Sequence, residues 1–427
     1  MRDLFHLSRD AALLAVLSVC AVFDLPAQNI FSNVPISGLQ AVPVSSMLWW
    51  DSDDDGRLDV LFKEFSSPYL GQLWHNRESG FTNAPLAGVP NATAGVAAWG
   101  DYDNDGQMDL LLLTSSNGVS GSQLWRNTGS GFVKVPIPGL PQVSGGSAAW
   151  GDYDNDGRPD FLITGWNTNN SAIAQLWHNT RDGFTNVPIP GLAGVVQGSI
   201  AWADYDNDGW RDFLVIGGSS SQLWRNTSSG FTNVPIFGLP GVPRGLAVWG
   251  DYDGDGKLDF LLTGGDGGFS LAQLWRNTGG GFTNLPVPGL PGAQQGAVAW
   301  GDYDNDGQLD FVLVGVNFIS PTAPAIAQLW RNTGAGFTKS SEAGLPGVYM
   351  GSAVCADYDN DGRLDILLCG ATDIRGFFGI SKLWRNVGTA STNVPPTAPT
   401  ALSAALSNGL AILSWSAATD DHTPVRL

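Results

Sequence analysis

The sequence is poor in the residues on which many catalytic and nucleic-acid-binding sites depend. Its 427 residues include only three cysteines and four histidines, and 21 lysines plus arginines against 40 aspartates plus glutamates, for a formal net charge of −19. No basic run is present, which argues against binding to a phosphate backbone. Because histidine and cysteine are so scarce, nothing in the sequence suggests a nucleophilic triad or a histidine metal site.

Long apolar runs are equally scarce. Ala11–Phe23 follows Arg2 and Arg9, is too short to span a bilayer and has the length of a signal-peptide core. We therefore predict a signal peptide over residues 1–27, a secreted or cell-surface product and no membrane-spanning segment. A lipid anchor at Cys20 is the weaker alternative, since the preceding valine is too large for that signal.

Few features remain that could stabilise the mature chain covalently. After cleavage only Cys355 and Cys369 are left, too few for a disulfide framework, and we expect buried thiols rather than a disulfide. Charged residues make up 14% of the chain, with 56 glycines and 25 prolines, which indicates many tight turns and few surface helices. Stability must then come from packing and metal.

What the sequence does contain is a repeat. The segment Gly100–Gly106, Gly-Asp-Tyr-Asp-Asn-Asp-Gly, recurs with small changes, giving seven copies 47 to 55 residues apart. A second motif, Leu-Trp-Arg/His-Asn, has its tryptophan at Trp74, Trp125, Trp177, Trp224, Trp275, Trp330 and Trp384. A third, Phe-Thr-Asn-x-Pro and close variants, starts at Phe31, Phe81, Phe132, Phe184, Phe231, Phe282 and Phe337.

Spacing within the repeat predicts four short strands per unit. Each motif phenylalanine lies 20 residues before the next aspartate loop, whereas the segment between the loop and the tryptophan varies in length. In one unit the strands are Ser147–Trp150, Asp160–Thr164, Ala174–Trp177 and Phe184–Val187, bounded by glycine, asparagine and proline. Seven such units predict an all-β, seven-bladed β-propeller. An open solenoid is the alternative, but it would need distinct polar capping repeats.

The phase of the repeat predicts how the ring closes. Asn29–Pro35 is a fourth-strand motif that precedes any first strand, and the last unit has no phenylalanine after Asn386. The N-terminal strand should therefore complete the seventh blade and remove an exposed sheet edge. We assign the propeller to residues 28–390, a proline-rich linker to 391–400, and a truncated β-sandwich stub, a fragment of a fibronectin type III-like domain, to 401–427.

The aspartate loop carries the chemistry. In Asp-x-Asp-x-Asp-Gly-x-x-Asp, carboxylates at positions 1, 3, 5 and 9 and the carbonyl of position 7 form an oxygen shell that suits Ca²⁺. An EF-hand would need a glutamate at position 12 and flanking helices, but Leu112 lies there within a strand. Turn chemistry alone would not retain the fourth aspartate seven times. The predicted ligands are Asp51, Asp53, Asp55, Arg57, Asp59, Asp101, Asp103, Asp105, Gln107, Asp109, Asp152, Asp154, Asp156, Arg158, Asp160, Asp204, Asp206, Asp208, Trp210, Asp212, Asp251, Asp253, Asp255, Lys257, Asp259, Asp302, Asp304, Asp306, Gln308, Asp310, Asp357, Asp359, Asp361, Arg363 and Asp365.

The acidity of the chain has the same origin. The loops hold 28 of the 40 acidic residues, and seven structural Ca²⁺ ions would take the net charge from −19 to −5. Paired aspartates could also resemble the carboxylates of a glycosidase, but their identical repetition favours metal.

These motifs resemble the FG-GAP/VCBS repeats, which are related to the propeller of integrin α-subunits. The resemblance covers roughly residues 29 to 390. It implies a calcium-stabilised propeller used outside the cell for binding or adhesion, with calcium mostly structural. Integrin propellers carry such loops in only some blades, whereas here every blade has one, which strengthens the metal interpretation and leaves the ligand open.

A further set of aromatic residues lies at a fixed place in the repeat. We predict that these rings form the core between blades rather than stack on a ligand, and Cys355 takes their place in the seventh unit. They are Trp49, Trp99, Trp150, Trp202, Trp249 and Trp300.

Loops of variable length lie on the face opposite the aspartate loops, and such loops on a rigid scaffold are common binding sites. They hold five aromatics outside the repeat, which are candidate ligand contacts, with local capping of the core as the alternative. Trp166 is the best candidate because its neighbours in Gly165–Asn170 are polar. The five are Tyr69, Trp166, Phe269, Phe318 and Phe377.

Together these features predict a secreted, calcium-binding propeller that acts as a non-catalytic extracellular binding or adhesion module. Its expected partner is an extracellular protein or glycan, without nucleic acid, and the propeller is expected to be monomeric. The alternatives are a carbohydrate-binding, lectin-like propeller or an accessory domain of a secreted hydrolase.

Overall fold

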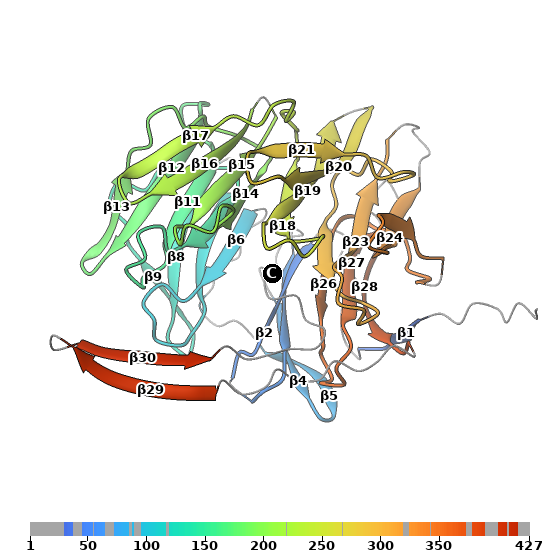
Figure 1. Cartoon of the computed structure of the whole chain (residues 1–427). Coiled ribbons are helices and arrows are strands. Elements are labelled where there is room, and N and C mark those ends of the chain that lie inside the picture. Colours follow the sequence, from blue (N-terminus) through green and yellow to red (C-terminus); the bar gives the residue numbers. More distant parts are fainter. Residues whose placement is uncertain are drawn as a thin grey trace, which may run out of the picture.

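The computed structural model (Figure 1) covers the propeller and two C-terminal strands. The predicted signal peptide and most of the predicted linker lie outside the described residues, so both stay predictions. Within the described part of the chain there is no helix, and hence none long and apolar enough to cross a membrane. The described residues are 30–36, 45–53, 55–64, 72–84, 88, 95–116, 119–218, 220–266, 268–318, 324–341, 343–372, 378–388, 400–407 and 410–416.

Seven antiparallel sheets of four strands confirm the predicted blades. The first strand of a blade ends in an aspartate loop, the second leaves it, and the third carries Leu-Trp-Arg/His-Asn. Blade 1 comprises β2 (Ser45–Trp50), β3 (Asp59–Glu64), β4 (Gln72–Arg77) and β5 (Gly80–Ala84); blade 2 comprises β6 (Gly95–Gly100), β7 (Asp109–Ser116), β8 (Val119–Asn127) and β9 (Phe132–Val135); blade 3 comprises β10 (Ala148–Gly151), β11 (Asp160–Trp166), β12 (Ala172–Thr180) and β13 (Gly183–Val187).

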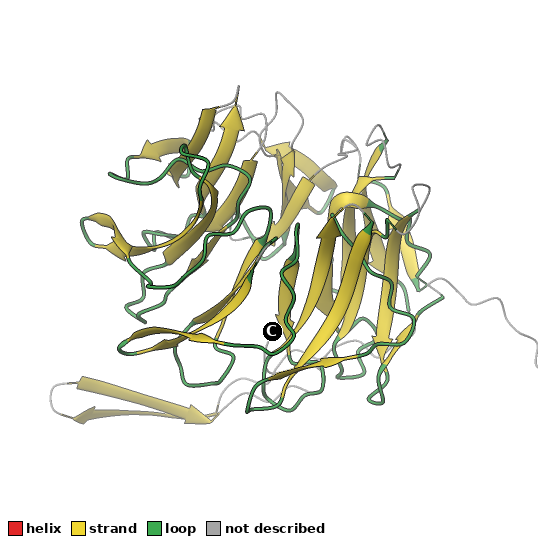
Figure 2. Ribbon diagram, turned by 90° about the horizontal axis from the view of Figure 1, so that it is seen from above, coloured by secondary structure: helices red, strands yellow, loops and turns green. Residues whose placement is uncertain are grey.

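The remaining blades repeat this order, and Figure 2 shows that strands and loops make up the whole described structure. Blade 4 comprises β14 (Ser199–Ala203), β15 (Asp212–Ile216), β16 (Ser221–Thr227) and β17 (Gly230–Val234); blade 5 comprises β18 (Leu246–Gly250), β19 (Asp259–Asp266), β20 (Phe269–Asn277) and β21 (Phe282–Leu285); blade 6 comprises β22 (Val298–Gly301), β23 (Asp310–Val316), β24 (Ala325–Asn332) and β25 (Phe337–Lys339); blade 7 comprises β26 (Tyr349–Ala356), β27 (Asp365–Ala371), β28 (Gly379–Asn386) and β1 (Phe31–Val34).

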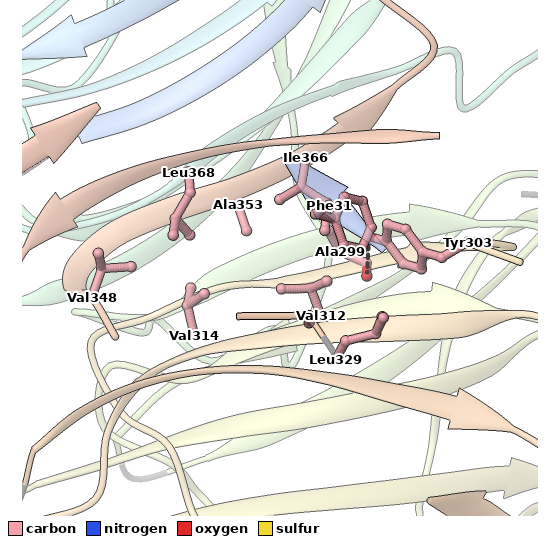
Figure 3. Packing of buried hydrophobic residues seen from close by; sticks show 11 residues of the cluster. Phe31, Ala299, Tyr303, Val312, Val314, Leu329, Val348, Ala353, Ile366 and Leu368 are labelled. Carbon is pink, nitrogen blue, oxygen red and sulfur yellow. Dashed lines mark hydrogen bonds between the residues drawn. The ribbon is translucent and has the colours of Figure 1, made fainter. Parts of the chain in front are cut away.

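Strand β1 closes the ring, as the phase of the repeat predicts. It pairs antiparallel with β28, and Phe31 lies opposite Asn386. The Phe31 side chain is only 2% exposed and meets the ring of Tyr303 from blade 6 edge-on, with 6.2 Å between the ring centroids. Figure 3 shows Phe31 between blades 6 and 7, beside Ala299, Tyr303 and Ile366. The N-terminal strand therefore holds two blades together.

Aromatic rings from successive strands fill each blade. In blade 3 the pairing register places Trp150 opposite Phe161, and Phe161 opposite Trp177. The rings of Phe161 and Trp177 stack with centroids 6.1 Å apart, and Phe184 lies 5.0 Å from Phe161. Since each large ring buries 150–250 Å², this cluster explains why the motif tryptophan and the following phenylalanine are always 7 residues apart in the first six units.

The tryptophans before the loops pack between blades, as predicted. Trp150 Nε1 donates a hydrogen bond to the carbonyl of Ala98 in the preceding blade, at 3.1 Å. A Cβ on Gly100 would come within 2.8 Å of the Trp150 ring, so a glycine is required there. In blade 7 Cys355 takes this position and its Sγ donates to the Trp300 carbonyl at 2.9 Å. The structure joins Cys355 and Cys369 by no disulfide.

The C-terminal segment forms a separate two-stranded antiparallel sheet, β29 (Thr400–Ser407) and β30 (Leu410–Ser416). Two strands agree with the alternation of that sequence but do not make a β-sandwich. The fibronectin-like fragment over 401–427 therefore stays a prediction.

Candidate metal centres in the aspartate loops

Each aspartate loop joins the first and second strands of its blade, and we number the loops as the blades. Two positions adopt a left-handed backbone, which favours asparagine and glycine. In loop 2, position 4 is Asn104 with φ of 56° and position 6 is Gly106 with φ of 86°. The Asn-Asp-Gly element is thus required by the turn, and this conformation allows the carboxylates at alternate positions to converge.

Backbone N–H groups fix the carboxylates at positions 1 and 5. Asp101 Oδ1 accepts from the Asp105 amide at 3.0 Å, and its Oδ2 accepts from the Gly106 amide at 2.9 Å. Asp105 Oδ1 accepts from the amide of Gln107, at position 7, at 2.9 Å. The same three bonds recur in all seven loops. The predicted metal ligation by the position 7 carbonyl stays a prediction.

The position 9 aspartate is the anchor of the loop. Asp109 has no exposed surface; its Oδ1 accepts from the Asn127 amide at 2.7 Å and its Oδ2 from the Tyr102 amide at 3.0 Å. It therefore ties the loop to the third strand. Its counterparts are equally buried and bonded: Asp59, Asp160, Asp212, Asp259, Asp310 and Asp365.

The carboxylates converge closely enough to share one ion. One oxygen each of Asp101, Asp103 and Asp109 lie within 4.8 Å of one another; the equivalent set occurs in loop 3, and in loop 1 the carboxylates at positions 1, 3 and 5 converge in the same way. At position 3, the Oδ1 atoms of Asp154, Asp304 and Asp359 are buried without a hydrogen-bond partner. A buried anionic oxygen with no donor is costly, and a hard divalent cation is the partner that this arrangement fits.

A basic side chain from the third strand also faces positions 3 and 5. Arg126 of the Leu-Trp-Arg-Asn motif places Nε 2.6 Å from Asp103 and Nη2 2.8 Å from Asp105. Corresponding arginines lie in four other blades, and histidines in blades 1 and 3. The sequence identifies these residues as members of the Leu-Trp-Arg/His-Asn motif. Their contact with the loop depends on the pairing of the third strand with the second, because Arg126 lies 21 residues from Asp105 in sequence. Each loop keeps an excess of negative charge.

Burial raises the pKa of the position 9 carboxyl in blades 2 to 7. In the absence of metal the pKa of Asp109 is about 7, because desolvation outweighs the two backbone N–H groups that lower it. The pKa values of Asp212, Asp259 and Asp365 are also raised by burial to about 7, that of Asp160 to about 6 and that of Asp310 to about 8. A cation beside each carboxylate would remove this penalty.

This burial predicts opposite pH dependences with and without metal. The folded pKa of these buried carboxyls lies above the unfolded value near 3.8. In the metal-free protein their contribution to the free energy of unfolding is therefore fully present below pH about 4 and is lost as the pH rises through about 6 to 8. In excess chelator, the melting temperature should therefore fall from pH 5 to pH 8. With calcium it should instead fall on acidification, as protons compete for the ligands. A scan with the same slope in both conditions would contradict this assignment.

Asparagines link neighbouring loops around the ring. Asn104 Nδ2 donates to the Gly157 carbonyl of the next loop at 2.7 Å, and four other loops make the same bond. The motif asparagine adds a second link, since Asn179 Nδ2 donates to the Tyr102 carbonyl of the preceding loop at 2.7 Å. A change of loop geometry in one blade is thus felt by its neighbours.

The interface between blades 1 and 2 departs from this pattern. Loop 1 has Ser52 where the others have tyrosine, and Trp50 where the others have glycine or alanine. Among the described contacts Asn127 Nδ2 bonds only to Met108 of its own blade, at 3.3 Å. A cavity of about 300 Å³ opens there, lined by Trp50 and Trp99 among others. This interface is the least cross-linked of the ring within the described residues.

Two of the candidate ligand contacts are exposed and one is not. Trp166 ends β11 with 41% of its surface exposed, and Phe269 begins β20 with 53%. Phe318 is half-buried against a cluster formed by Val316 and Tyr349, which agrees with the core-capping alternative. Tyr69 and Phe377 lie outside the described residues.

The same face carries two exposed rings that the sequence analysis did not single out. Phe237 is 99% exposed in the connection between blades 4 and 5, and Phe378 is 70% exposed before β28. Strands 2 and 4 run away from the aspartate loops, so hairpins after strand 2 and connections after strand 4 share one face. A phenylalanine inside a repeated segment, where other units have proline, alanine or serine, is the signal that could have identified Phe237.

Among the residues that the structure describes, one serine–histidine–aspartate group occurs, but its geometry is not that of a triad. Ser52 Oγ and Asp59 Oδ2 both approach the same nitrogen of His75, Nδ1, at 3.1 and 3.0 Å. A relay needs the two partners on opposite ring nitrogens. This group therefore offers no activated serine.

Comparison with known proteins places the chain in a family. A model of the FG-GAP-like repeat matches five overlapping segments, 51–112, 101–163, 152–215, 204–262 and 251–313. Each match runs from one aspartate loop past the next, and together they span more than half of the chain. The protein belongs to the FG-GAP-like repeat family, whose propellers are typically binding modules, and the predicted resemblance is confirmed.

Comparisons with whole proteins are weaker. No curated protein matches the chain. A solved lectin from Agrocybe aegerita, described as recognising non-reducing terminal N-acetylglucosamine, is 16% identical over 70% of this chain and 80% of its own, with a TM-score of 0.49. A Lactobacillus plantarum protein is 14% identical over 80% of this chain and 99% of its own, with a TM-score of 0.42. Neither of these two similarities bears on which ligand this chain binds.

Proposed function

We propose that the protein is a secreted, non-catalytic binding module whose propeller is held together by up to seven structural Ca²⁺ ions. The observation that carries the metal assignment is the seven-fold recurrence of a loop in which a buried position 9 carboxylate lies beside further carboxylates, with an unsatisfied position 3 oxygen in loops 3, 6 and 7. Ca²⁺ takes six to eight oxygen ligands in a flexible shell, which such a loop can supply. Mg²⁺ would need a stricter octahedron.

The metal loops and the candidate ligand face lie at opposite ends of the blades, which separates stability from binding. Backbone bonds hold Trp166 in place, because its N–H donates to the Ser144 carbonyl at 2.9 Å and its carbonyl accepts from Ser144 at 3.0 Å. An exposed ring on a fixed backbone contributes contact area at low entropic cost. We infer that the exposed aromatics of this face bind an extracellular protein or glycan.

Replacing Trp166 with alanine tests the ligand face. Capture of ligand should weaken at least about tenfold, the usual loss for an anchoring tryptophan worth more than about 1.4 kcal/mol. Calcium affinity and melting temperature should stay unchanged, because 41% of the residue is already exposed. Phe318→Ala is the matched control, since that ring is half-buried against a cluster and should affect stability more than capture. Loss of stability without loss of capture at Trp166 would assign it to the core.

A glycan array and a pull-down with extracellular proteins distinguish the two ligand classes. Enrichment of particular sugars would support the lectin form of the proposal, and protein partners alone would support adhesion. If neither probe binds the wild-type chain while calcium is bound, the binding role fails and the metal assignment stands.

A further inference from the structure

The metal loops are not equivalent, because two of them face a histidine instead of an arginine. In five blades the motif arginine reaches positions 3 and 5, as Arg225 does with Asp206 at 2.6 Å and Asp208 at 2.9 Å. Its guanidinium neutralises part of the loop and can donate but not ligate. In blade 3 this residue is His178, which offers a metal-ligating nitrogen in the same place.

His178 is directed at the carboxylates by its surroundings. Its Nδ1 lies 3.3 Å from Asp154 and 3.2 Å from Asp160. The ring meets Tyr153 edge-on, at 5.7 Å and 82°, which fixes its orientation. Asp160 has no exposed surface, and Asp154 Oδ1 is buried without a hydrogen-bond partner. A fixed imidazole thus faces a fully buried carboxylate and an unsatisfied one.

These distances suit a small ion with mixed ligands. Zn²⁺ lies about 2.0–2.2 Å from nitrogen and oxygen ligands in a tetrahedron, so neighbouring ligand atoms are roughly 3.3–3.6 Å apart. The two nitrogen–oxygen separations at His178 are within about 0.1 Å of the lower value. Imidazole is a good ligand for zinc, copper and nickel but not for the hard Ca²⁺ ion, which prefers oxygen.

Blade 1 also has a histidine, but its ligands are already engaged. His75 Nδ1 lies 3.0 Å from Asp59 and 3.5 Å from Asp53. However, Ser52 Oγ approaches the same nitrogen at 3.1 Å, and a second arginine, Arg77, pairs with both Asp53 and Asp55. In blade 3 the described contacts place no serine at His178, and Arg158 pairs with Asp156 rather than with Asp154, so the ligand set of blade 3 is the more open of the two.

We propose that loop 3 is a transition-metal site, selective for an ion of the Zn²⁺ class, in which His178, Asp154 and Asp160 supply one nitrogen and two carboxylate ligands. The proposal rests on the proposed function, in that it takes the loops to be cation sites, and it assigns one of them a different ion. Sequence reasoning missed it because the histidine lies 18 residues beyond the loop's last aspartate.

Cobalt tests the site, because Co²⁺ bound by nitrogen and oxygen in a distorted tetrahedron absorbs strongly in visible light. The full chain is titrated with Co²⁺ in excess Ca²⁺, which occupies the other loops. One equivalent should develop the band, and one equivalent of Zn²⁺ should abolish it. His178→Gln should lose the band, His75→Gln should keep it, and Arg225→His should add a second equivalent by copying the arrangement into blade 4.

The outcomes separate the two proposals. If the chain binds calcium but His178→Gln leaves the cobalt band unchanged, or the wild type shows no band, loop 3 is an ordinary calcium loop and this inference is wrong. If neither calcium nor cobalt binds, the proposed function fails as well. Should His178→Gln not fold, Arg225→His decides the question. Binding of a second cobalt equivalent supports the assignment, and failure to bind a second equivalent overturns it.

Discussion

Removal of calcium with excess chelator is expected to lower the melting temperature by about 10 °C or more. Extracellular calcium sites bind with dissociation constants of about 10⁻⁴ to 10⁻³ M, so at about 1 mM calcium each contributes roughly 0.5 to 1.5 kcal/mol. Seven sites would contribute several kcal/mol. Chelation would also leave four carboxylates together in each loop, and in blades 2 to 7 burial raises the pKa of the position 9 carboxyl to about 6 to 8.

Differential scanning calorimetry measures this effect. Chelator saturated with calcium beforehand is the control and should leave the melt unchanged. Asparagines bond one loop to the next, as Asn104 does to Gly157 at 2.7 Å. Because chelation disturbs the loops that these bonds connect, the blades should unfold less cooperatively and the transition should also broaden. A melt in excess chelator that superimposes on the calcium-loaded one would contradict a structural role for the ion.

Deletion of residues 29–35 is expected to destabilise the protein severely. It removes β1 from blade 7, leaves β28 as an open sheet edge, and takes Phe31 from its buried position between blades 6 and 7. Loss of a buried phenylalanine alone costs about 3 to 5 kcal/mol, and the unpaired edge promotes aggregation. Light scattering during thermal unfolding should therefore rise earlier and more steeply than for the intact chain.

A shorter deletion provides the matched control. Removing residues 1–27 leaves β1 (Phe31–Val34) intact and should melt like the full chain. Phe31→Ala should fall between the two, because it keeps the strand pairing and loses only the packing against Tyr303. If the 29–35 deletion melted like the control, closure by the N-terminal strand would be wrong.

Local pattern was enough to predict the blades and the ring closure. The motif tryptophan and phenylalanine keep a fixed spacing because Trp177 and Phe184 both pack on Phe161 within one blade. A fourth-strand motif precedes the first unit and the last unit lacks one, so the sequence predicted that the N-terminal strand completes the seventh blade. Such features depend on neighbours close in sequence or on repetition, and both can be read without coordinates.

Features that depend on distant pairing could not be predicted. The bond from Asn179 to Tyr102 spans 77 residues, and nothing in either motif indicates it. Likewise, Phe318 is half-buried and Phe237 fully exposed although both are aromatics in loops. The sequence analysis also found no sign of a histidine metal site, because His178 meets Asp154 and Asp160 only once β12 pairs with β11. Burial and cross-strand contact decide these cases.

The stoichiometry of calcium binding tests the central claim most directly. Equilibrium dialysis of the full chain at up to about 10 mM Ca²⁺, well above the expected dissociation constants of about 10⁻⁴ to 10⁻³ M, should give six to seven ions per chain: one for each of the six aspartate loops other than loop 3, and a seventh where loop 3 also accepts Ca²⁺. Asp206→Ala should lower this number by one and leave the other loops filled. Binding of no ion, or of a single ion that Asp206→Ala does not affect, would contradict the assignment of the loops as calcium sites.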